Sequence, residues 1–298
     1  MAITTSQAAT TVPVSRRRFH PGPALRYAFL LLVALLFLYP LYWMFTSSLK
    51  PSQDIATIPL SFDPRTLSLD NYTGLLSAVP LWVGFKNTAV VLLFKGGLTM
   101  FFCPLAGFAF AKYRFRGRNF LFTLMLSTMM LPPIVFLIPL LLEMGTLGWV
   151  NTFQALVLPG AVGAFAIFWM RQQIADVPDE LLDAGRIDGC SPFGLYWRIV
   201  LPVIRPALAA LAILTFLDIY NDFVWPVVAI NTEDMQTLQV MLSALYTTIN
   251  NAQVGTSGAS AWGEVLAASA LATLPVLILF VALQRHFIRG VMAGSVKG

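Results

Sequence analysis

Residues 27–49 read YAFLLLVALLFLYPLYWMFTSSL, a run without charge between Arg26 and Lys50. About 20 predominantly apolar residues in a helix span the hydrocarbon core of a bilayer, so this run predicts a transmembrane helix. The whole composition agrees: 57% of the 298 residues are apolar and 11% are charged, whereas soluble domains carry roughly 25% charged residues. A mean hydropathy of +0.74 also excludes an intrinsically disordered chain. The bilayer is therefore the expected solvent.

Further apolar runs follow along the chain. Residues 119–142, 144–170 and 265–284 carry no charge, whereas 87–111 and 206–230 are each interrupted by one or two charged residues. The sequence thus predicts an all-α, polytopic membrane protein. We expect a disordered arm over 1–23, a membrane domain over 24–288 and a polar tail over 289–298, with six spans at about 27–49, 87–111, 119–142, 152–170, 206–230 and 264–284.

The distribution of basic residues predicts the orientation. With six spans both termini lie on the same side, and 15 of the 19 Lys and Arg residues fall on that side. Lys and Arg are enriched in short cytoplasmic segments, so both termini and the long loop 171–205 are expected in the cytoplasm. The net charge of +5 then reflects membrane orientation and not nucleic-acid binding.

Metal and disulfide chemistry are not indicated. Cys103 and Cys190 lie far apart in unlike contexts, and His20 and His286 lack the spacing of metal ligands. We therefore expect no metal site and no disulfide framework.

Two short helices are predicted within the loop 171–205. Asp176-Val177-Pro178-Asp179 is typical of a helix start, with an acidic cap and a proline in the first turn. The helix should end at Gly189, and Ser191-Pro192 should begin the next one, with Ser191 as its cap and Pro192 as its first residue. The two helices would meet at a glycine hinge.

The second of these helices carries an apolar stripe. Phe193, Tyr196, Trp197 and Val200 occupy positions i, i+3, i+4 and i+7, which share one face of an α-helix. Such a stripe outside the membrane needs a partner. The candidates are the chain's own spans, the lipid surface, or a groove in another protein.

The same loop carries a recognisable spacing: Asp183-Ala184-Gly185, three residues, Gly189, nine residues, then Ile199-Val200-Leu201-Pro202. This pattern resembles the EAA loop of ATP-binding-cassette importer permeases, in which Glu-Ala-Ala stands at the first position, so Asp183 and Gly185 depart from it. The resemblance implies a loop that docks into an ATPase subunit. The residues implied in this coupling are Asp183, Ala184, Gly185, Gly189, Phe193, Tyr196, Trp197, Leu201 and Pro202.

Four other segments resemble the carbohydrate importers of maltose-transporter type within that family: MLPP at 130–133, MRQ at 170–172, YNDFVWP at 220–226 and RGVMAGSVKG at 289–298. The resemblance implies the type I importer permease fold and import of a sugar, a di- or oligosaccharide, across a bacterial or archaeal cytoplasmic membrane. It also implies a second, different permease subunit, two ATPase subunits and an extracytoplasmic solute-binding protein as partners. A second ATPase contact is implied at the tail residues Gly294, Lys297 and Gly298.

No phosphate-binding loop of the form G-x-x-x-x-G-K-[ST] occurs in the sequence. We therefore expect this chain to be a transport subunit and not an enzyme, without a cofactor of its own. ATP and Mg²⁺ would be bound by the partner ATPase.

Polar residues inside the predicted spans suggest a substrate path. Asp218, Asn221, Asp222 and Trp225 fall at i, i+3, i+4 and i+7, one face of a continuous helix, where they could bind sugar hydroxyls and stack on a sugar ring. The alternative is a structural polar patch between permease subunits. Lys95 lies about 13 Å inside Lys86 at 1.5 Å per residue, and we expect it to pair with Asp218.

Two classes of alternative remain open at this point, and a third, an intramembrane hydrolase, lacks its residues. The same machinery could import a glycerol phosphate or a polyol. An ion-coupled secondary carrier could use Lys95, Asp218 and Asp222 as its relay. Residues 255–258, GTSG, resemble the serine motif of an intramembrane hydrolase, but they lie in a polar loop with no histidine nearby in the sequence.

Overall fold

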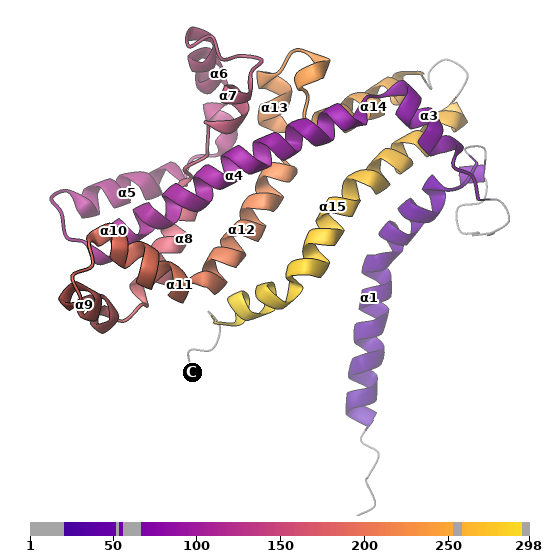
Figure 1. Ribbon diagram of the computed structural model, residues 1–298. Coiled ribbons are helices and arrows are strands. Elements are labelled where there is room, and N and C mark those ends of the chain that lie inside the picture. The colour runs from indigo at the N-terminus through magenta and orange to yellow at the C-terminus, as the bar shows by residue number, and fades with distance from the viewer. Residues whose placement is uncertain (1–20, 52–53, 56–66, 253–257, 294–298) are drawn as a thin grey trace, which may run out of the picture. The chain divides into compact units, whose positions relative to one another are not determined.

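The computed structural model describes residues 21–51, 54–55, 67–252 and 258–293, and no strand occurs among them. The predicted all-α class is thereby confirmed (Figure 1). The chain divides into two units, residues 1–43 and 44–298. The first contributes most of α1 (Pro21–Ser48), whose apolar side chains from Leu25 to Leu38 are largely exposed. A helix with apolar residues all round is one that lipid can solvate.

Among the described residues, three helices are long and apolar enough to cross a membrane: Leu25–Ser48 of α1, α4 (Leu81–Lys112), and Trp262–Leu283 of α15 (Gly258–Ala293). Two strongly bent helix pairs raise the number to five if each pair counts as one span. The expected span 152–170 is divided into α7 (Phe153–Val157) and α8 (Ala164–Ala175). The count of six spans therefore stays a prediction.

Prolines account for the breaks. α5 (Arg118–Thr128) is followed by η2 (Pro133–Phe136) and α6 (Leu137–Thr146) after a bend of 95° at Pro132-Pro133. A proline lacks the amide hydrogen that continues a helix, and it disfavours the helical conformation of the residue before it. The expected continuous span 119–142 is accordingly interrupted.

The expected span 206–230 is also interrupted. α12 (Arg205–Tyr220) ends before residues 221–223, and α13 (Val224–Ala229) follows them. Before α12 the chain bends by 83° from a helical segment made of α10 (Pro192–Leu195), the π-helical turn η3 (Tyr196–Val200) and α11 (Leu201–Val203).

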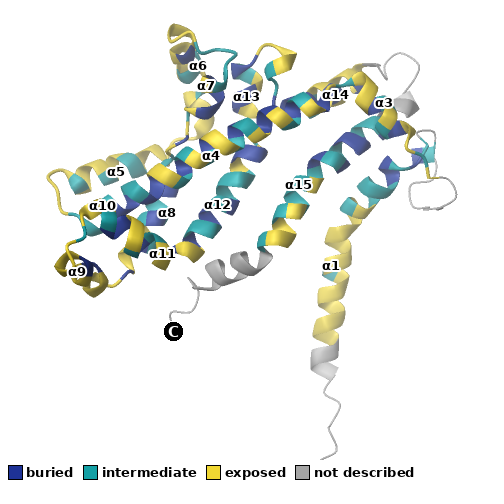
Figure 2. Cartoon of the chain, viewed as in Figure 1, coloured by how far each residue is buried: buried dark blue, intermediate teal, exposed yellow. Residues whose placement is uncertain are grey.

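α4 packs closely along α8 and the residues before it. The Thr99 hydroxyl donates to the Ala161 carbonyl at 2.7 Å. Gly107 has no side chain, and a Cβ atom there would come within 2.9 Å of the Arg171 nitrogen and of Met170 Cβ. The close approach buries a hydrophobic cluster formed by the C-terminal half of α4 together with α8 and the start of α12. These buried residues are dark blue in Figure 2.

The other half of α4 meets the remaining helices. α3 (Asp70–Ala78), η4 (Glu233–Met235) and α14 (Leu238–Ala252) lie around its N-terminal end. The Asn87 amide donates to the carbonyls of Asp234 and Gln236, both at 2.9 Å. On α12, the Tyr220 hydroxyl donates to the Ala272 carbonyl of α15 at 2.7 Å. These bonds satisfy polar groups that the bilayer core would leave unpaired.

Candidate functional site

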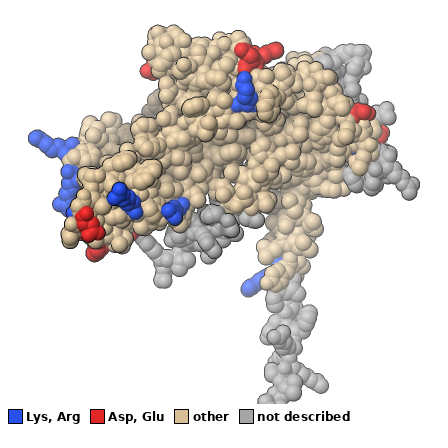
Figure 3. Space-filling view, in the orientation of Figure 1, with Lys and Arg blue, Asp and Glu red and all other residues tan. Residues whose placement is uncertain are grey.

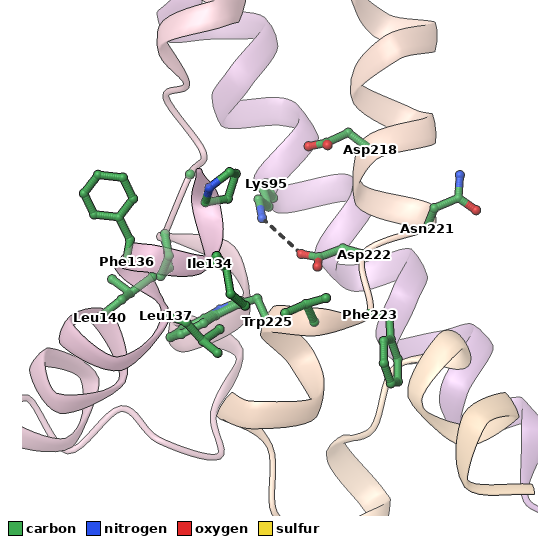
Figure 4. Close-up of a pocket in the computed structure, with 14 residues that line it drawn as sticks. Lys95, Ile134, Phe136, Leu137, Leu140, Asp218, Asn221, Asp222, Phe223 and Trp225 are labelled. Carbon is green, nitrogen blue, oxygen red and sulfur yellow. Dashed lines mark ion pairs between the residues drawn. The ribbon is translucent and has the colours of Figure 1, made fainter. Parts of the chain in front are cut away.

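A cavity of about 730 Å³ opens beside the break between α12 and α13. One wall is polar and comes from α4 and residues 218–223, and the other is apolar and comes from η2 and α6 (Figure 4). Both broken spans therefore meet at this cavity. Its lining residues include Lys95, Asp218, Asn221, Asp222 and Trp225, together with Pro133, Ile134, Phe136, Leu137 and Leu140.

An ion pair crosses the polar wall. Lys95 Nζ lies 3.8 Å from Asp222 Oδ2. The expected pairing of Lys95 with Asp218 was therefore wrong in its partner. Both carboxylates project from the end of α12 toward Lys95 (Figure 4), but only Asp222, beyond the last turn of the helix, comes within ion-pair distance.

The expected common helix face of Asp218, Asn221, Asp222 and Trp225 does not form, because α12 ends at Tyr220. Asn221 extends to the side opposite Asp222 (Figure 4), and its amide donates to the Leu217 carbonyl at 2.8 Å. Trp225 is buried, with its indole N–H donating to the Ala155 carbonyl at 2.7 Å. Unwinding, and not helical periodicity, brings these residues to one cavity.

A second hollow, of about 380 Å³, shares Lys95, Asp218 and Gly160 with the first. It runs along α12 as far as Leu211 and is bordered by Thr99 and Thr215. Asp218 is exposed and lines both spaces. The polar residues of the broken helix thus stand where the two hollows adjoin.

The loop 171–205 folds as two helical segments around a glycine, as predicted. α9 (Asp179–Ile187) begins at Asp179, three residues after the expected acidic cap Asp176, which instead follows the end of α8. Gly189 has φ +80°, in the left-handed region that favours glycine. Ser191 caps α10, its hydroxyl accepting from the Gly194 amide at 3.1 Å.

The apolar stripe of this loop divides between two surroundings. Tyr196 is 1% exposed and packs against Phe108 of α4, with ring centroids 5.6 Å apart. Phe193 and Trp197 are each 54% exposed, and their rings stack at 6.1 Å. The expectation that Tyr196 contacts another protein is therefore wrong, because its ring belongs to the chain's own core.

Gly185 shows why glycine can stand where the resembled pattern has alanine. A Cβ atom there would overlap Ile199 Cδ1 and would lie 2.6 Å from Leu195 Cδ2. The small residue lets α9 approach α10 and η3 of the same chain. Asp183 and Ala184 are exposed, and Asp183 Oδ1 pairs with Arg186 at 2.6 Å. Leu201 is half-buried and Pro202 exposed.

Lys112, which the sequence did not single out, ties α4 to this loop. Its ammonium donates to the Val177 carbonyl at 2.6 Å, to the Ala175 carbonyl at 3.3 Å and to Asp179 Oδ1 at 2.7 Å. The hydrogen bond from Lys112, and then its charge, lower the pKa of the Asp179 carboxyl. The end of α4 is therefore fastened to the first turn of α9.

Two further expectations concern the C-terminal tail and metal binding. The tail residues Gly294, Lys297 and Gly298 are outside the described residues. Within the described ranges, no group of three or more His, Cys, Asp or Glu side chains could hold a metal ion.

Long apolar helices and a cavity that lies at two broken helices and contains an ion pair define the class, a membrane transport protein. The sequence of residues 104–293 matches the family of binding-protein-dependent transport system inner membrane components. The match covers more than half of the chain, which belongs to this family. The predicted resemblance to importer permeases is confirmed.

Similar proteins span nearly the whole chain. The arabinooligosaccharides transport system permease protein AraQ of Halalkalibacterium halodurans is 38% identical, over 89% of this chain and 93% of its own. The sn-glycerol-3-phosphate transport system permease protein UgpE of Salmonella typhi is 30% identical, over 86% and 90%. A bacterial ABC transporter involved in the import of the acidic polysaccharide alginate has a chain that matches with a TM-score of 0.78, 25% identity, and coverage of 93% and 100%.

Proposed function

We propose that this chain is the permease subunit of an importer that moves a di- or oligosaccharide across the cytoplasmic membrane. The cavity at the broken helices carries this proposal. Its volume of about 730 Å³ lies in the range of small-molecule sites, roughly 300–1,000 Å³. Carboxylate and ammonium groups on one wall offer acceptors and donors for hydroxyls, while the apolar wall offers surface to the faces of a sugar ring.

The charge of this cavity favours a neutral solute over glycerol phosphate. Asp218 and Asp222 face a single ammonium, that of Lys95, and Asp222 already neutralises it. A phosphate group in the cavity would lie near the Asp218 carboxylate. Among the described lining residues, no cation other than the paired Lys95 could balance its charge. Like charges at short range repel in a medium of low dielectric constant. The polyol alternative carries no charge and is left to the transport assay.

The energy for transport would come from separate subunits. The sequence contains no phosphate-binding loop, and we propose that two ATPase subunits bind ATP and Mg²⁺ and that this chain hydrolyses nothing itself. Phe193 and Trp197 support this role for the loop, because two large stacked rings stand exposed on a helical segment next to a buried Tyr196. Exposed aromatic anchors of this kind dominate the energetics of protein interfaces.

The remaining parts of the assembly are proposed from the same family. They are a second, different permease subunit, which would complete the cavity, and an extracytoplasmic solute-binding protein. The basic residues around 112–118 and in the loop 171–205 support the proposal that those segments and both termini lie in the cytoplasm. Lys and Arg lie at the end that carries α5, α9 and α10 in Figure 3.

The proposal is tested by uptake into proteoliposomes. The purified complex, with its ATPase and solute-binding protein, should import a radiolabelled arabino-oligosaccharide or disaccharide only with internal ATP. Glycerol 3-phosphate and a polyol are offered in parallel. Uptake of these and not of sugars would replace the sugar assignment.

An ion-coupled carrier is the second candidate, favoured by the pairing of Lys95 with Asp222 in the cavity. Proteoliposomes with this chain alone separate the two functions. Uptake driven by a proton or sodium gradient, without ATPase subunits, would establish the carrier. Its absence, with ATP-driven uptake by the full complex, supports the permease.

A further inference from the structure

The short connection from α4 to α5 concentrates positive charge. Residues 112–118 contain four basic side chains and no acidic one. Lys112 is bound to Asp179, but Arg114, Arg116 and Arg118 form no ion pair with any carboxylate of the described residues. Figure 3 shows basic side chains gathered at this end of the molecule. Three guanidinium groups are therefore available to an anion.

A hollow of about 380 Å³ lies within this connection. Gly117, with φ +80°, turns the backbone, and a Cβ atom there would meet nothing within 4 Å, so the space above it is open. Arg118 is held over the loop by a 3.2 Å hydrogen bond from its guanidinium to the Tyr113 carbonyl. The lining residues are Arg114, Phe115, Gly117, Arg118, Asn119 and Phe120.

Aromatic side chains hold the loop between α4 and α5 in place. The ring of Phe110 on α4 lies 5.7 Å from the ring of Phe115 and 5.4 Å from that of Phe122 on α5. The arginines thus sit on a loop anchored to both helices. A hollow held in this way needs little reordering when a ligand binds, which lowers the entropic cost of binding.

An apolar surface continues from the hollow along α5. No residue of α5 is buried, and Phe120 is 70% exposed, with Leu121 and Leu124 also exposed. α4 is long and apolar enough to cross a membrane, and α5 passes the same test together with η2 and α6 as a bent pair, so we expect the short connection between α4 and α5 at the membrane surface. A charged hollow beside an apolar helix face matches a molecule with an anionic head and apolar tails.

We propose that the hollow at residues 113–120 binds the headgroup of an anionic phospholipid. The planar guanidinium groups of Arg114 and Arg118 suit a phosphate diester, which accepts paired N–H bonds. The acyl chains would lie along Phe120 and Leu124 of α5. Charge complementarity and the adjoining apolar face select a lipid over an acidic protein surface, which would match the charge but leave α5 uncovered. This inference does not depend on which solute is transported.

The test is native mass spectrometry of the purified complex titrated with phosphatidylglycerol and, separately, with phosphatidylcholine of the same acyl chains. Wild type should bind phosphatidylglycerol more tightly. Each basic residue near an anionic lipid contributes about fivefold in affinity, so Arg114→Gln with Arg118→Gln should weaken phosphatidylglycerol by more than about tenfold and leave phosphatidylcholine unchanged. Arg114→Lys keeps the charge but loses the paired N–H bonds, so it should weaken phosphatidylglycerol binding less than Arg114→Gln does.

Arg26→Gln is the matched control for the single variant Arg114→Gln, because each removes one exposed positive charge and they lie in different basic segments. Equal loss in this variant would show a general charge effect and overturn the site, as would equal binding of the two lipids. Displacement of the lipid by inorganic phosphate would show an anion site instead. If the double variant does not assemble, a photoreactive phosphatidylglycerol on the wild-type complex decides: adducts are expected within 113–120, and adducts only elsewhere contradict the proposal.

Discussion

Lys95 on α4 and Asp222, two residues beyond the end of α12, form an ion pair of 3.8 Å at the polar wall of the cavity. Lys95 is buried and Asp222 is partly exposed, so removing one partner leaves a poorly solvated charge, at a cost of up to about 3 kcal/mol. Lys95→Met should therefore lower the thermal stability of the purified complex, as should Asp222→Asn. The double variant should recover part of the loss, because neither charge remains.

Asp218→Asn provides the control for this pair. Asp218 makes no ion pair with Lys95, so its substitution should leave the unfolding temperature close to that of wild type and change uptake only. If Lys95→Met is rescued by Asp218→Asn and not by Asp222→Asn, the pairing in the structure is wrong.

Tyr196 is buried whereas the neighbouring Trp197 is exposed, so their substitution should have unequal effects on stability. Tyr196→Ala empties a buried site and should destabilise the chain by about 3–5 kcal/mol, measured as loss of folded protein and a lower denaturation midpoint. Trp197→Ala removes an exposed ring and should change stability by less than about 0.5 kcal/mol. A comparable loss of stability in both variants would contradict the observed burial.

The Lys112–Asp179 contact predicts a pH dependence with a defined sign. Lys112 lowers the pKa of Asp179 below its ordinary value of 3.8, so the ionised carboxylate stabilises the folded state at higher pH. That contribution is lost as the pH falls through the lowered pKa. Asp179→Asn should therefore be less stable than wild type at pH 6, and the difference should shrink below about pH 3.8. A difference that grows on acidification would contradict this sign.

Gly189 should not tolerate substitution, because its φ is +80°. A side chain in the left-handed region costs about 1–2 kcal/mol, and a β-branched one is worse. Gly189→Val should thus disturb the link between α9 and α10, seen as faster proteolysis of the loop. Gly97→Ala is the control: Gly97 lies inside α4 with nothing within 4 Å of an added Cβ, and this variant should remain as resistant as wild type.

The sequence was sufficient where local chemistry decides the structure. Ser191, Pro192 and Gly189 define the ends of short helices through a side-chain cap, a fixed φ and a left-handed turn, and each was placed correctly. The helical class also follows directly, because only helices and closed barrels satisfy the backbone inside a bilayer. Family membership followed from one spaced motif.

The cavity could not be predicted, because it depends on where spans break and on how they pack. Hydropathy treats residues 206–230 as one helix, although Pro226 and the polar residues 221–222 were a signal for unwinding. Pro132-Pro133 was the corresponding signal for the apolar wall. The predicted partner of Lys95 was wrong because the prediction compared membrane depths along continuous helices. Asp222 lies beyond the end of α12, where a rise of 1.5 Å per residue no longer applies. Helical periodicity likewise does not tell which ring of the stripe packs on the chain's own core, as Tyr196 does against Phe108.

Coupling through the exposed rings is the central claim, and one measurement on the reconstituted importer tests it most directly. Sugar uptake and ATPase co-purification are compared for wild type, Phe193→Ala, Trp197→Ala and Gly189→Val. We predict that all three variants lose most of their ATP-driven uptake. They should lose less of the ATPase association, because the family resemblance implies a second ATPase contact at the tail 289–298. Normal uptake by all three variants would show that the loop 171–205 is not the coupling element.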